Sequence, residues 1–181
     1  MRSETYITEL KEEHIDQAAG VLTRSFIELN TIWKEHQPKF EEIFPIIRGK
    51  VVPSVAAGWS FVLMKGQKVI GVSIEYELLD YLKMPSMPSN LELFKSIGNA
   101  GERLMAKLDF SHLKRGDAIY GLYGVIDPSE SNQGHSLQFW WNLFAIGKIG
   151  GWKYYYSRIS SPVSLKMLQK LGAEVLAEED C

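Results

Sequence analysis

The sequence predicts a single domain of the α/β (α+β) class, with helices packed against a central sheet. Three observations lead to this class. Apolar residues recur with helical and with strand spacing in alternating stretches along the chain. Residues 118–148 read as a hydrophobic strand, a polar turn and an apolar helix in direct succession. The 181 residues, 45% of them hydrophobic, suffice for one sizeable core and contain no internal repeat. We therefore expect residues 1–181 to form one domain.

The N-terminal half is expected to begin with a strand and two helical segments. Residues 6–10 alternate like a short strand, and residues 12–30 place apolar side chains on one helical face. Residues 40–57 are apolar and partly helical, and we expect Pro45 and Pro53 to break them because proline lacks a backbone N–H. A hairpin completes this half, with strands 59–64 and 68–77 around the turn 65–67.

The C-terminal half continues the alternation of helix and strand. Residues 84–90 contain two prolines and two serines and are a predicted loop, and residues 91–108 form a helix that Gly98 and Gly101 weaken. The last four elements are expected as a strand, a helix, a strand and a helix at residues 118–126, 134–148, 152–159 and 162–171.

Charge and composition argue against several classes of partner. The net charge of −2 gives no field that would attract nucleic acid or an anionic membrane. The longest apolar stretch, residues 139–149, is too short to span a bilayer. The N-terminus lacks the apolar core of a signal peptide, and the single Cys181 cannot form an internal disulfide, so we expect a cytoplasmic protein. The four histidines are isolated in the sequence and predict no metal site.

The turn after residues 118–126 is the most informative segment. Asp127 and Pro128 end the strand, and a polar stretch follows that contains Gly134 and the small Ser136. The free N–H groups at a helix N-terminus bind phosphate, and a glycine lets the backbone approach a ligand closely. The segment predicts an anion-binding turn, with an ordinary serine-rich N-capped loop as the alternative.

This turn resembles the pyrophosphate-binding motif of the GCN5-related N-acetyltransferases (GNAT). The motif reads Val-x-Pro-x-x-(Arg/Gln)-x-x-Gly-x-(Gly/Ala), and its defined positions correspond here to Ile126, Pro128, Ser131, Gly134 and Ser136. Ser131 and Ser136 depart from the pattern, because Ser131 lacks a long polar side chain and Ser136 is small but neither glycine nor alanine.

A second similarity lies downstream. The family's pattern Asn-x-x-Ser-x-x-Leu-Tyr-x-Lys-x-Gly-Phe resembles residues 161–173, which keep Ser164, Lys170 and Gly172. The resemblance implies the GNAT fold, a mixed central sheet with flanking helices whose fourth and fifth strands splay apart. The helix inserted at residues 91–108 points to the arylalkylamine N-acetyltransferase-like branch.

The resemblance also implies acetyl-CoA as the cofactor. The backbone of Gly124, Val125 and Ile126 would hold the pantetheine arm. Alternatively, Gly121 and Gly124 could relieve crowding from Tyr120, Tyr123 and the nearby tryptophans. The cofactor's remaining contacts are expected from the turn and the last helix, at Ser131, Asn132, Gln133, Gly134, His135, Ser136, Ser161 and Ser164.

Acetyl transfer requires an acid that protonates the departing thiolate. The position that holds a tyrosine in many family members is Leu168 here, which cannot donate a proton. Ser164 and Tyr123 are therefore the candidate acids. Ser160 and Ser161 have a competing structural interpretation as the N-cap of a helix that begins with Pro162.

The base that deprotonates the amine is expected to be Glu28, by resemblance to the arylalkylamine-type enzymes. Glu75 and Glu77 are alternatives on the strand 68–77, although most glutamates on strands are simply solvated. Five aromatic residues fall in segments that roof the acceptor site of the family and suit an apolar amine, although core packing explains each of them as well: Trp33, Phe40, Phe44, Trp59 and Tyr81.

The expected function is acetyl-CoA-dependent acetyl transfer, directly to a small primary amine. The alternatives are a GNAT-fold protein that binds CoA without catalysis, as a regulatory or interaction module, and an acyl-carrier or interaction module that only shares the fold. Because few residues follow residue 172, a second copy could supply a missing last strand, so a homodimer is one expectation.

Overall fold

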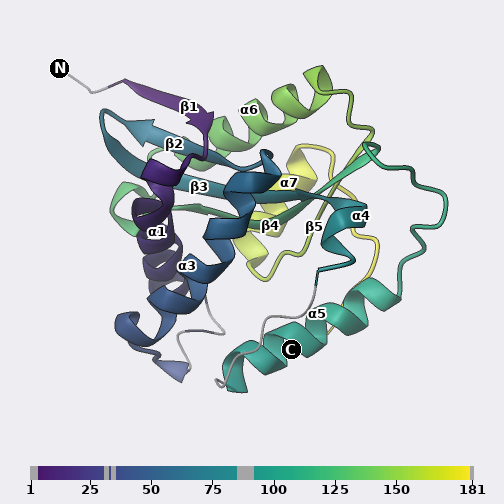
Figure 1. Cartoon of the computed structure of the whole chain (residues 1–181), viewed down its shortest axis with the longest axis horizontal. Helices are drawn as coiled ribbons and strands as arrows, with labels where there is room; N and C mark the ends of the chain where they lie inside the picture. Colours follow the sequence, from purple (N-terminus) through teal and green to yellow (C-terminus); the bar gives the residue numbers. More distant parts are fainter. Residues whose placement is uncertain (1–3, 31–32, 34–35, 85–91, 180–181) are drawn as a thin grey trace.

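The computed structural model describes residues 4–30, 33, 36–84 and 92–179, and its centre is a mixed sheet. In the described part, five strands follow the order β1-β2-β3-β4-β5. All neighbouring pairs are antiparallel except β4 and β5, which run parallel (Figure 1). This arrangement confirms the predicted fold class. The strands are β1 (Thr5–Glu9), β2 (Phe61–Lys65), β3 (Lys68–Glu77), β4 (Ala118–Ile126) and β5 (Tyr154–Ser157).

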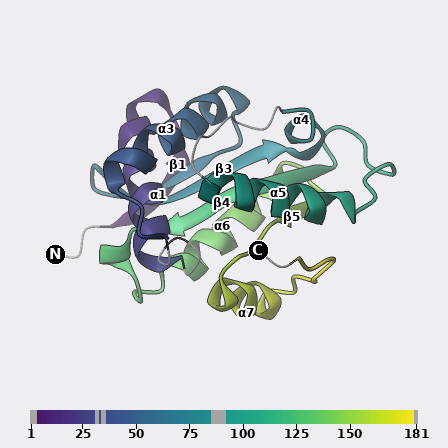
Figure 2. The same cartoon turned by 90° about the horizontal axis from the view of Figure 1, so that it is seen from below.

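Helices cover both faces of this sheet (Figure 2). On one face, α1 (Ile15–Leu29) and α3 (Phe40–Ala57) pack against β3 through residues such as Leu22, Val72 and Ile74. On the other face, α6 (His135–Ile149) and α7 (Pro162–Lys170) pack against Leu63 and Ile70. Other helices whose bounds are described are the single turns η1 (Glu12–His14) and η2 (Pro128–Glu130), α4 (Leu78–Tyr81) and the inserted α5 (Glu92–Ala106).

The central strand β3 is buried along almost its whole length. Every residue after Lys68 is buried, because β2 and β4 pair with its two edges and helices cover both of its faces. Such a strand reads as a nearly continuous apolar run instead of a polar and apolar alternation. The same burial applies to Glu75 and Glu77, although most strand glutamates are solvated.

The helix α3 corrects one expectation, because neither proline breaks it. Pro45 and Pro53 both lie inside an 18-residue helix. A proline leaves the carbonyl four residues earlier without its helical partner, here Glu41 and Gly49. Both prolines and both of these residues are exposed, so water can satisfy the carbonyls that the prolines leave free.

The segment around β5 is shorter than the predicted strand 152–159. The N–H of Trp152 donates to the carbonyl of Gly147 (3.0 Å), and that of Lys153 donates to the carbonyl of Asp117 (2.9 Å), so the chain joins the ladder only at Tyr154. After α7, the described residues 171–179 form no strand; Glu179 instead pairs with Arg103 of α5 (2.5 Å). Among the described residues, no helix has the length and apolar character that crossing a bilayer requires.

Candidate functional site

Among the strands that the structure describes, only β3 pairs with the second half of β4. β3 pairs with β4 from Ile119 to Ile126, whereas β5 pairs only with residues 118–121. The Ser157 hydroxyl donates to the Gly121 carbonyl (2.9 Å) at the point where β4 and β5 separate. A register shift opposite Ile74 and Glu75 leaves Leu122 without a partner, which is a β-bulge. Residues 122–126 therefore present an edge to which an extended ligand could add, as the predicted splay requires.

The two glycines of β4 make room for aromatic rings on the α6 face. A Cβ at Gly121 would overlap the Tyr155 hydroxyl oxygen, and a Cβ at Gly124 would lie 2.8 Å from Cζ2 of Trp140. Both glycines therefore relieve aromatic crowding, from a tryptophan at Gly124 as the alternative interpretation expected, but at Gly121 from Tyr155, which it did not name. Gly124 is nevertheless exposed, so its backbone remains accessible.

Of the three residues predicted to hold the pantetheine arm, Ile126 already uses its carbonyl. The Ser25 hydroxyl of α1 donates to this carbonyl at 2.9 Å, and Ile126 is buried. Gly124 and Val125 are more open than Ile126. The accessible part of the unpaired edge therefore centres on Gly124 and Val125.

The predicted anion-binding turn has a backbone suited to that role. Asn132 (φ 61°) and Gly134 (φ 81°) both adopt left-handed conformations directly before α6. Asn132, Gln133, Gly134 and Ser136 are exposed, while Ser131 and His135 are half-buried. The first turn of α6 carries no acidic residue that would compete with an anion for its N–H groups. A phosphate can therefore approach these N–H groups from solvent.

Asp127 holds the start of this turn in place. Its carboxylate accepts hydrogen bonds from the Ser129 hydroxyl (2.6 Å) and N–H (3.0 Å), and it pairs with Arg24 of α1 (2.6 Å). Burial alone would raise the pKa of Asp127, but the bonds from Ser129 and Arg24 lower it overall. Nearby, Lys65 pairs with Glu130 (2.8 Å) and lowers the pKa of that carboxyl.

His135 has an unusual environment for a residue at a helix start. Its Nε2 is buried without a hydrogen-bond partner and lies 3.8 Å from a carboxylate oxygen of Glu130. In the part of the chain that the structure covers, no cluster of histidine, cysteine and acidic side chains could hold a metal ion.

Tyr123 lies on the α1 and α3 face of β4. Its ring packs against Phe26 at 5.0 Å between centroids, with Nζ of Lys50 5.9 Å from its centroid. Burial, more than any other factor, raises the pKa of the Tyr123 hydroxyl well above its usual value. The hydroxyl is therefore protonated at neutral pH, but it is a weaker acid than an ordinary tyrosine.

The serines at the start of α7 include the predicted N-cap. The Ser161 hydroxyl accepts the N–H of Ser164 at 3.3 Å, with Pro162 in the first helical turn, so the capping interpretation of Ser161 is confirmed. The Ser160 hydroxyl instead accepts a hydrogen bond from the side-chain amide of Asn30 (3.0 Å). The end of α1 therefore meets the start of α7, where the half-buried Ser164 lies.

Leu168, which replaces the family's tyrosine, is part of the core. It is 5% exposed and packs in the cluster that contains Ile70, Phe139 and Leu143. It supplies no proton donor, and its place is fixed by packing between α7, α6 and the sheet.

Glu28 is exposed and belongs to a different part of the surface. It lines a shallow hollow with Arg24, Lys68, Asp127, Pro128 and Ser129. No hydrogen bond or ion pair joins Glu28 to Tyr123 or Ser164, all three of which lie in the described part. Glu28 therefore lies near the C-terminal end of β4, where the turn begins, whereas Tyr123 lies in the middle of the strand.

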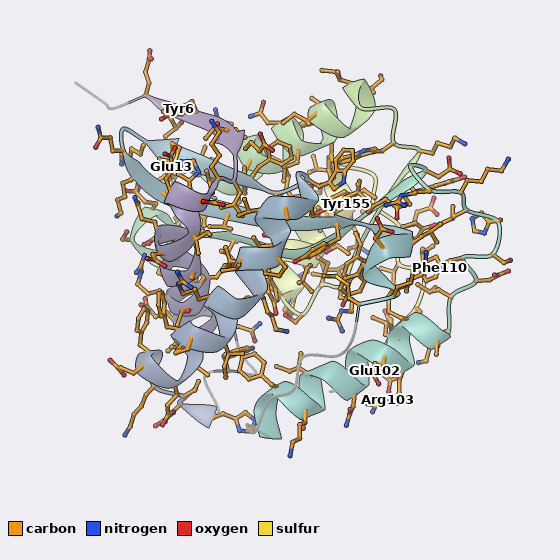
Figure 3. The ribbon with its side chains drawn as sticks, viewed as in Figure 1. Tyr6, Glu13, Glu102, Arg103, Phe110 and Tyr155 are labelled. Atoms are coloured by element: carbon orange, nitrogen blue, oxygen red, sulfur yellow. The ribbon has the colours of Figure 1, made fainter. Side chains whose placement is uncertain are left out.

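Glu75 is the titratable residue that sequence reasoning underrated. It is fully buried, and its Oε1 accepts hydrogen bonds from the hydroxyls of Ser73 (2.6 Å) and Tyr155 (3.2 Å), while Oε2 has no partner. Burial raises the pKa of Glu75 to about 7, against the smaller opposing effect of the two hydroxyls. Figure 3 marks Tyr155 within the body of the molecule. The place of residues 68–77 at the centre of the sheet was the signal that could have revealed this burial.

Glu77 has a structural role at the end of β3. One carboxylate oxygen accepts the N–H of Asp80 (2.9 Å) and the other accepts the N–H of Gly116 (3.1 Å). The side chain therefore caps α4 and ties the loop before β4 to β3. Of the two strand glutamates, only Glu75 keeps an oxygen without a partner.

Comparison with solved structures agrees with this geometry. The C-terminal condensation domain of Ebony, in complex with beta-alanyl-dopamine, matches with a TM-score of 0.77 and 11% identity over 96% of this chain and 84% of that one. The mosquito protein called arylalkylamine N-acetyltransferase like 5b matches with a TM-score of 0.70 and 18% identity, over 96% of this chain and 85% of that one.

A third structure is AAC(6')-Iy in complex with a bisubstrate analog, CoA-S-monomethyl-acetylneamine. It matches with a TM-score of 0.55 and 16% identity over 99% of this chain and 100% of that one. By sequence, no protein-family model and no curated protein matches the chain. These matches agree with the separation of β4 from β5 and with the left-handed turn before α6. The chain therefore has the fold of the GCN5-related N-acetyltransferases, a fold that arylalkylamine N-acetyltransferases share.

Proposed function

We propose that the protein is an acyltransferase that moves an acetyl group from acetyl-CoA directly to a small primary amine. The observation that carries this proposal is the unpaired edge of β4, which leads into the left-handed turn and the N-terminus of α6. Together they offer an extended backbone edge and an anion-binding turn in series, the two features that a pantetheine arm and a pyrophosphate need. Structures with the same fold include one in complex with a CoA-containing bisubstrate analog.

The cofactor contacts follow from this placement. Gly124 and Val125 would bond the pantetheine arm, with Ile126 limited by its bond to Ser25. The pyrophosphate would bind to the loop before α6 and to the first residues of that helix, at Ser131, Asn132, Gln133, Gly134, His135 and Ser136. Ser161 and Ser164, at the start of α7, would add further cofactor contacts.

The reaction forms a bond between the amine nitrogen and the thioester carbon and breaks the carbon–sulfur bond. The amine loses one proton and the departing thiolate gains one. A backbone N–H on the free edge of β4 would polarise the carbonyl. Tyr123 and Ser164 are the two candidate acids: Tyr123 carries a proton at neutral pH, although burial makes its hydroxyl a weaker acid than an ordinary tyrosine.

For the base, we retain Glu28 and Glu75 as competing proposals. Glu75 titrates near neutral pH but is buried, so a proton would have to reach it through the Tyr155 hydroxyl. If Glu75 is the base, Glu75→Gln lowers kcat/KM at least tenfold and removes an ionisation near pH 7 from the pH profile. Full activity with an unchanged profile would exclude Glu75 and leave Glu28.

A CoA-binding protein without catalysis is the second candidate function, and Leu168 favours it. The side chain at the usual tyrosine position is apolar and buried. Thiol release from acetyl-CoA in the presence of an amine panel separates the two functions, because only an acetyltransferase releases CoA in proportion to amine acetylated. A cytoplasmic location and a homodimer stay predictions.

Acetyl-CoA binding can be tested at the turn with a matched pair of variants. Gly134 and Gly151 share a φ of 81°, and an added Cβ would meet no other atom within 4 Å at either position. Gly134→Ala and Gly151→Ala should therefore each lose roughly 1–2 kcal/mol from backbone strain. At a hundredfold excess of acetyl-CoA over its Kd, the wild type and Gly151→Ala should gain about 2.7 kcal/mol, whereas Gly134→Ala should gain much less.

Thermal unfolding with and without acetyl-CoA measures this difference. Equal shifts in both variants would contradict the assignment of the turn. No shift in the wild type at millimolar acetyl-CoA would contradict cofactor binding itself.

A further inference from the structure

Two basic side chains converge on the α1 and α3 face of β4, beside Tyr123. Lys50 comes from α3, and its Nζ lies 5.7 Å from the ring centroid of Phe94 and 5.9 Å from that of Tyr123. Arg158 follows β5 and extends to α5, where its guanidinium fills the space that a Cβ on Gly101 would need. We call Lys50 and Arg158 the cation pair.

The cation pair lies among neutral side chains. The groups that act electrostatically on Lys50 are Tyr81 and Arg158, and those that act on Arg158 are Tyr81, Tyr120 and Tyr123. Within the described residues, neither cation forms a salt bridge. Elsewhere in the chain, exposed or half-exposed cations do reach carboxylates, as Arg24 reaches Asp127 and Arg48 reaches Asp16.

Two further observations describe the environment of the two cations. Burial lowers the pKa of Lys50; Tyr81 opposes this effect, and the charge of Arg158 adds a smaller lowering, because two like charges in a half-buried position repel each other. The buried hydroxyl of Tyr120 has Tyr81 and Arg158 as its polar neighbours, and it interacts with Arg158 both through charge and through a side-chain hydrogen bond. Buried charges and hydroxyls are normally paired, because losing water without a new partner is costly.

The position of the cation pair relates it to the reaction proposed above. Tyr123 lies in the part of β4 that β5 does not pair with, residues 122–126. The turn that would bind the phosphates begins after Ile126, at the end of this part of the strand. The rings next to Lys50 belong to a larger aromatic cluster. Phe94 meets Trp33 edge-on at 5.0 Å between centroids, and Trp33 stacks on Phe26 at 5.1 Å. An anion there would come from the acceptor, since the phosphates would bind at the turn.

We propose that the acceptor is an amine that also carries a carboxylate, as an amino acid does, and that Lys50 and Arg158 bind this carboxylate. The proposal rests on the acetyl-transfer function proposed above and narrows its substrate class. A guanidinium binds a carboxylate through two parallel hydrogen bonds, and the ammonium of Lys50 adds a second charge. The aromatic walls favour an apolar or aromatic side chain on the same molecule.

Binding tests the proposal without any catalysis. The probes are N-acetylphenylalanine and N-acetylphenethylamine, which differ only in the carboxylate. The wild type should bind the first at least tenfold more tightly in calorimetry. Lys50→Met, which keeps the aliphatic stem, should remove most of this preference, and Arg158→Gln should do the same.

The matched control is Arg48→Met on the same helix. Arg48 is exposed and pairs with Asp16, two residues from Lys50 in sequence but outside the cation pair. The preference should survive in Arg48→Met. Loss of the preference in Arg48→Met as well would point to a general charge effect and overturn the proposal.

Turnover separates the failure of this inference from the failure of the proposed function. Phenylalanine and tyrosine should be acetylated with a kcat/KM at least tenfold above that of phenethylamine and tyramine, and Lys50→Glu should invert the order. Equal or faster turnover of the two amines, with a ratio unchanged in Lys50→Met, would overturn the carboxylate site and leave acetyl transfer in place. No turnover of any acceptor, with the binding preference intact, would overturn acetyl transfer and leave the carboxylate site.

Discussion

At the scale of single residues, Glu75 owes its properties to three neighbours. Ser73 and Tyr155 donate to one carboxylate oxygen, and Gly121 leaves the space in which the Tyr155 hydroxyl lies. A side chain at position 121 would displace Tyr155 and break this arrangement. Ser73 lies two residues away on the same strand, but Tyr155 and Gly121 come from distant segments that the local sequence around Glu75 does not reveal.

Because the pKa of Glu75 is raised, its burial lowers the free energy of unfolding by an amount that depends on pH. The unfolded chain releases this proton near pH 4.5, whereas the folded chain holds it to about pH 7. The folded state therefore loses stability as pH rises from 4.5 to 7, by about 3 kcal/mol in total.

Glu75→Gln should remove this cost while keeping an acceptor for Ser73 and Tyr155. We expect the variant to match the wild type at pH 4 and to exceed its free energy of unfolding by up to about 3 kcal/mol at pH 8. Urea unfolding of both proteins across this range measures the difference. A difference that is the same at both pH values would contradict the raised pKa.

At the scale of elements, α3 shows how tertiary packing outweighs local preference. Its inward residues Ile43, Ile47 and Val51 are buried, and this apolar face keeps the segment helical despite two prolines. The prolines are tolerated because they lie on the solvent side, but they still remove two helical hydrogen bonds.

We therefore expect Pro53→Ala to stabilise the protein. The new N–H at residue 53 would bond the Gly49 carbonyl, for a gain of about 1–3 kcal/mol after the greater entropy of the unfolded chain is subtracted. The control is Pro162→Ala, because Pro162 lies in the first turn of α7 where no N–H is needed. Thermal unfolding should show a rise for Pro53→Ala and no rise for Pro162→Ala; the reverse order would contradict this account.

At the scale of the whole molecule, the distribution of charge bears on the choice of acceptor. The net charge is −2, yet the two cations Lys50 and Arg158 lie beside the middle of β4. Acidic side chains such as Glu179 are engaged elsewhere, in this case with Arg103 and Lys107. A polycation would find no acidic surface in the described part next to Tyr123.

Polyamines should accordingly be poor acceptors. We expect spermine to be acetylated with a lower kcat/KM than tyramine, because capture of a polycation depends on an acidic cleft. Initial rates at low and high salt provide the measurement. Faster turnover of spermine, with strong suppression by salt, would show an acidic acceptor site instead.

The sequence by itself determined the elements whose signals are local. The strands at residues 68–77 and 118–126 have the predicted bounds, because their apolar runs end at turns that adjacent residues specify. The turn from Asp127 to Gly134 was also predictable, since Asp-Pro and a glycine before a helix act within a few residues. These local signals, together with the family resemblance that they carry, were enough to predict the fold and the position of the turn that we propose to bind an anion.

Only the tertiary structure decided which side chains share an environment. Lys50 of α3 and Arg158, which follows β5, are far apart in the sequence, yet the charge of Arg158 acts on Lys50 in the folded protein. Glu75 is buried because helices cover both faces of the sheet, while Glu28 of α1 lies in a separate hollow. Burial and charge depend on partners that folding brings from distant segments, and no pattern of neighbouring residues encodes those partners.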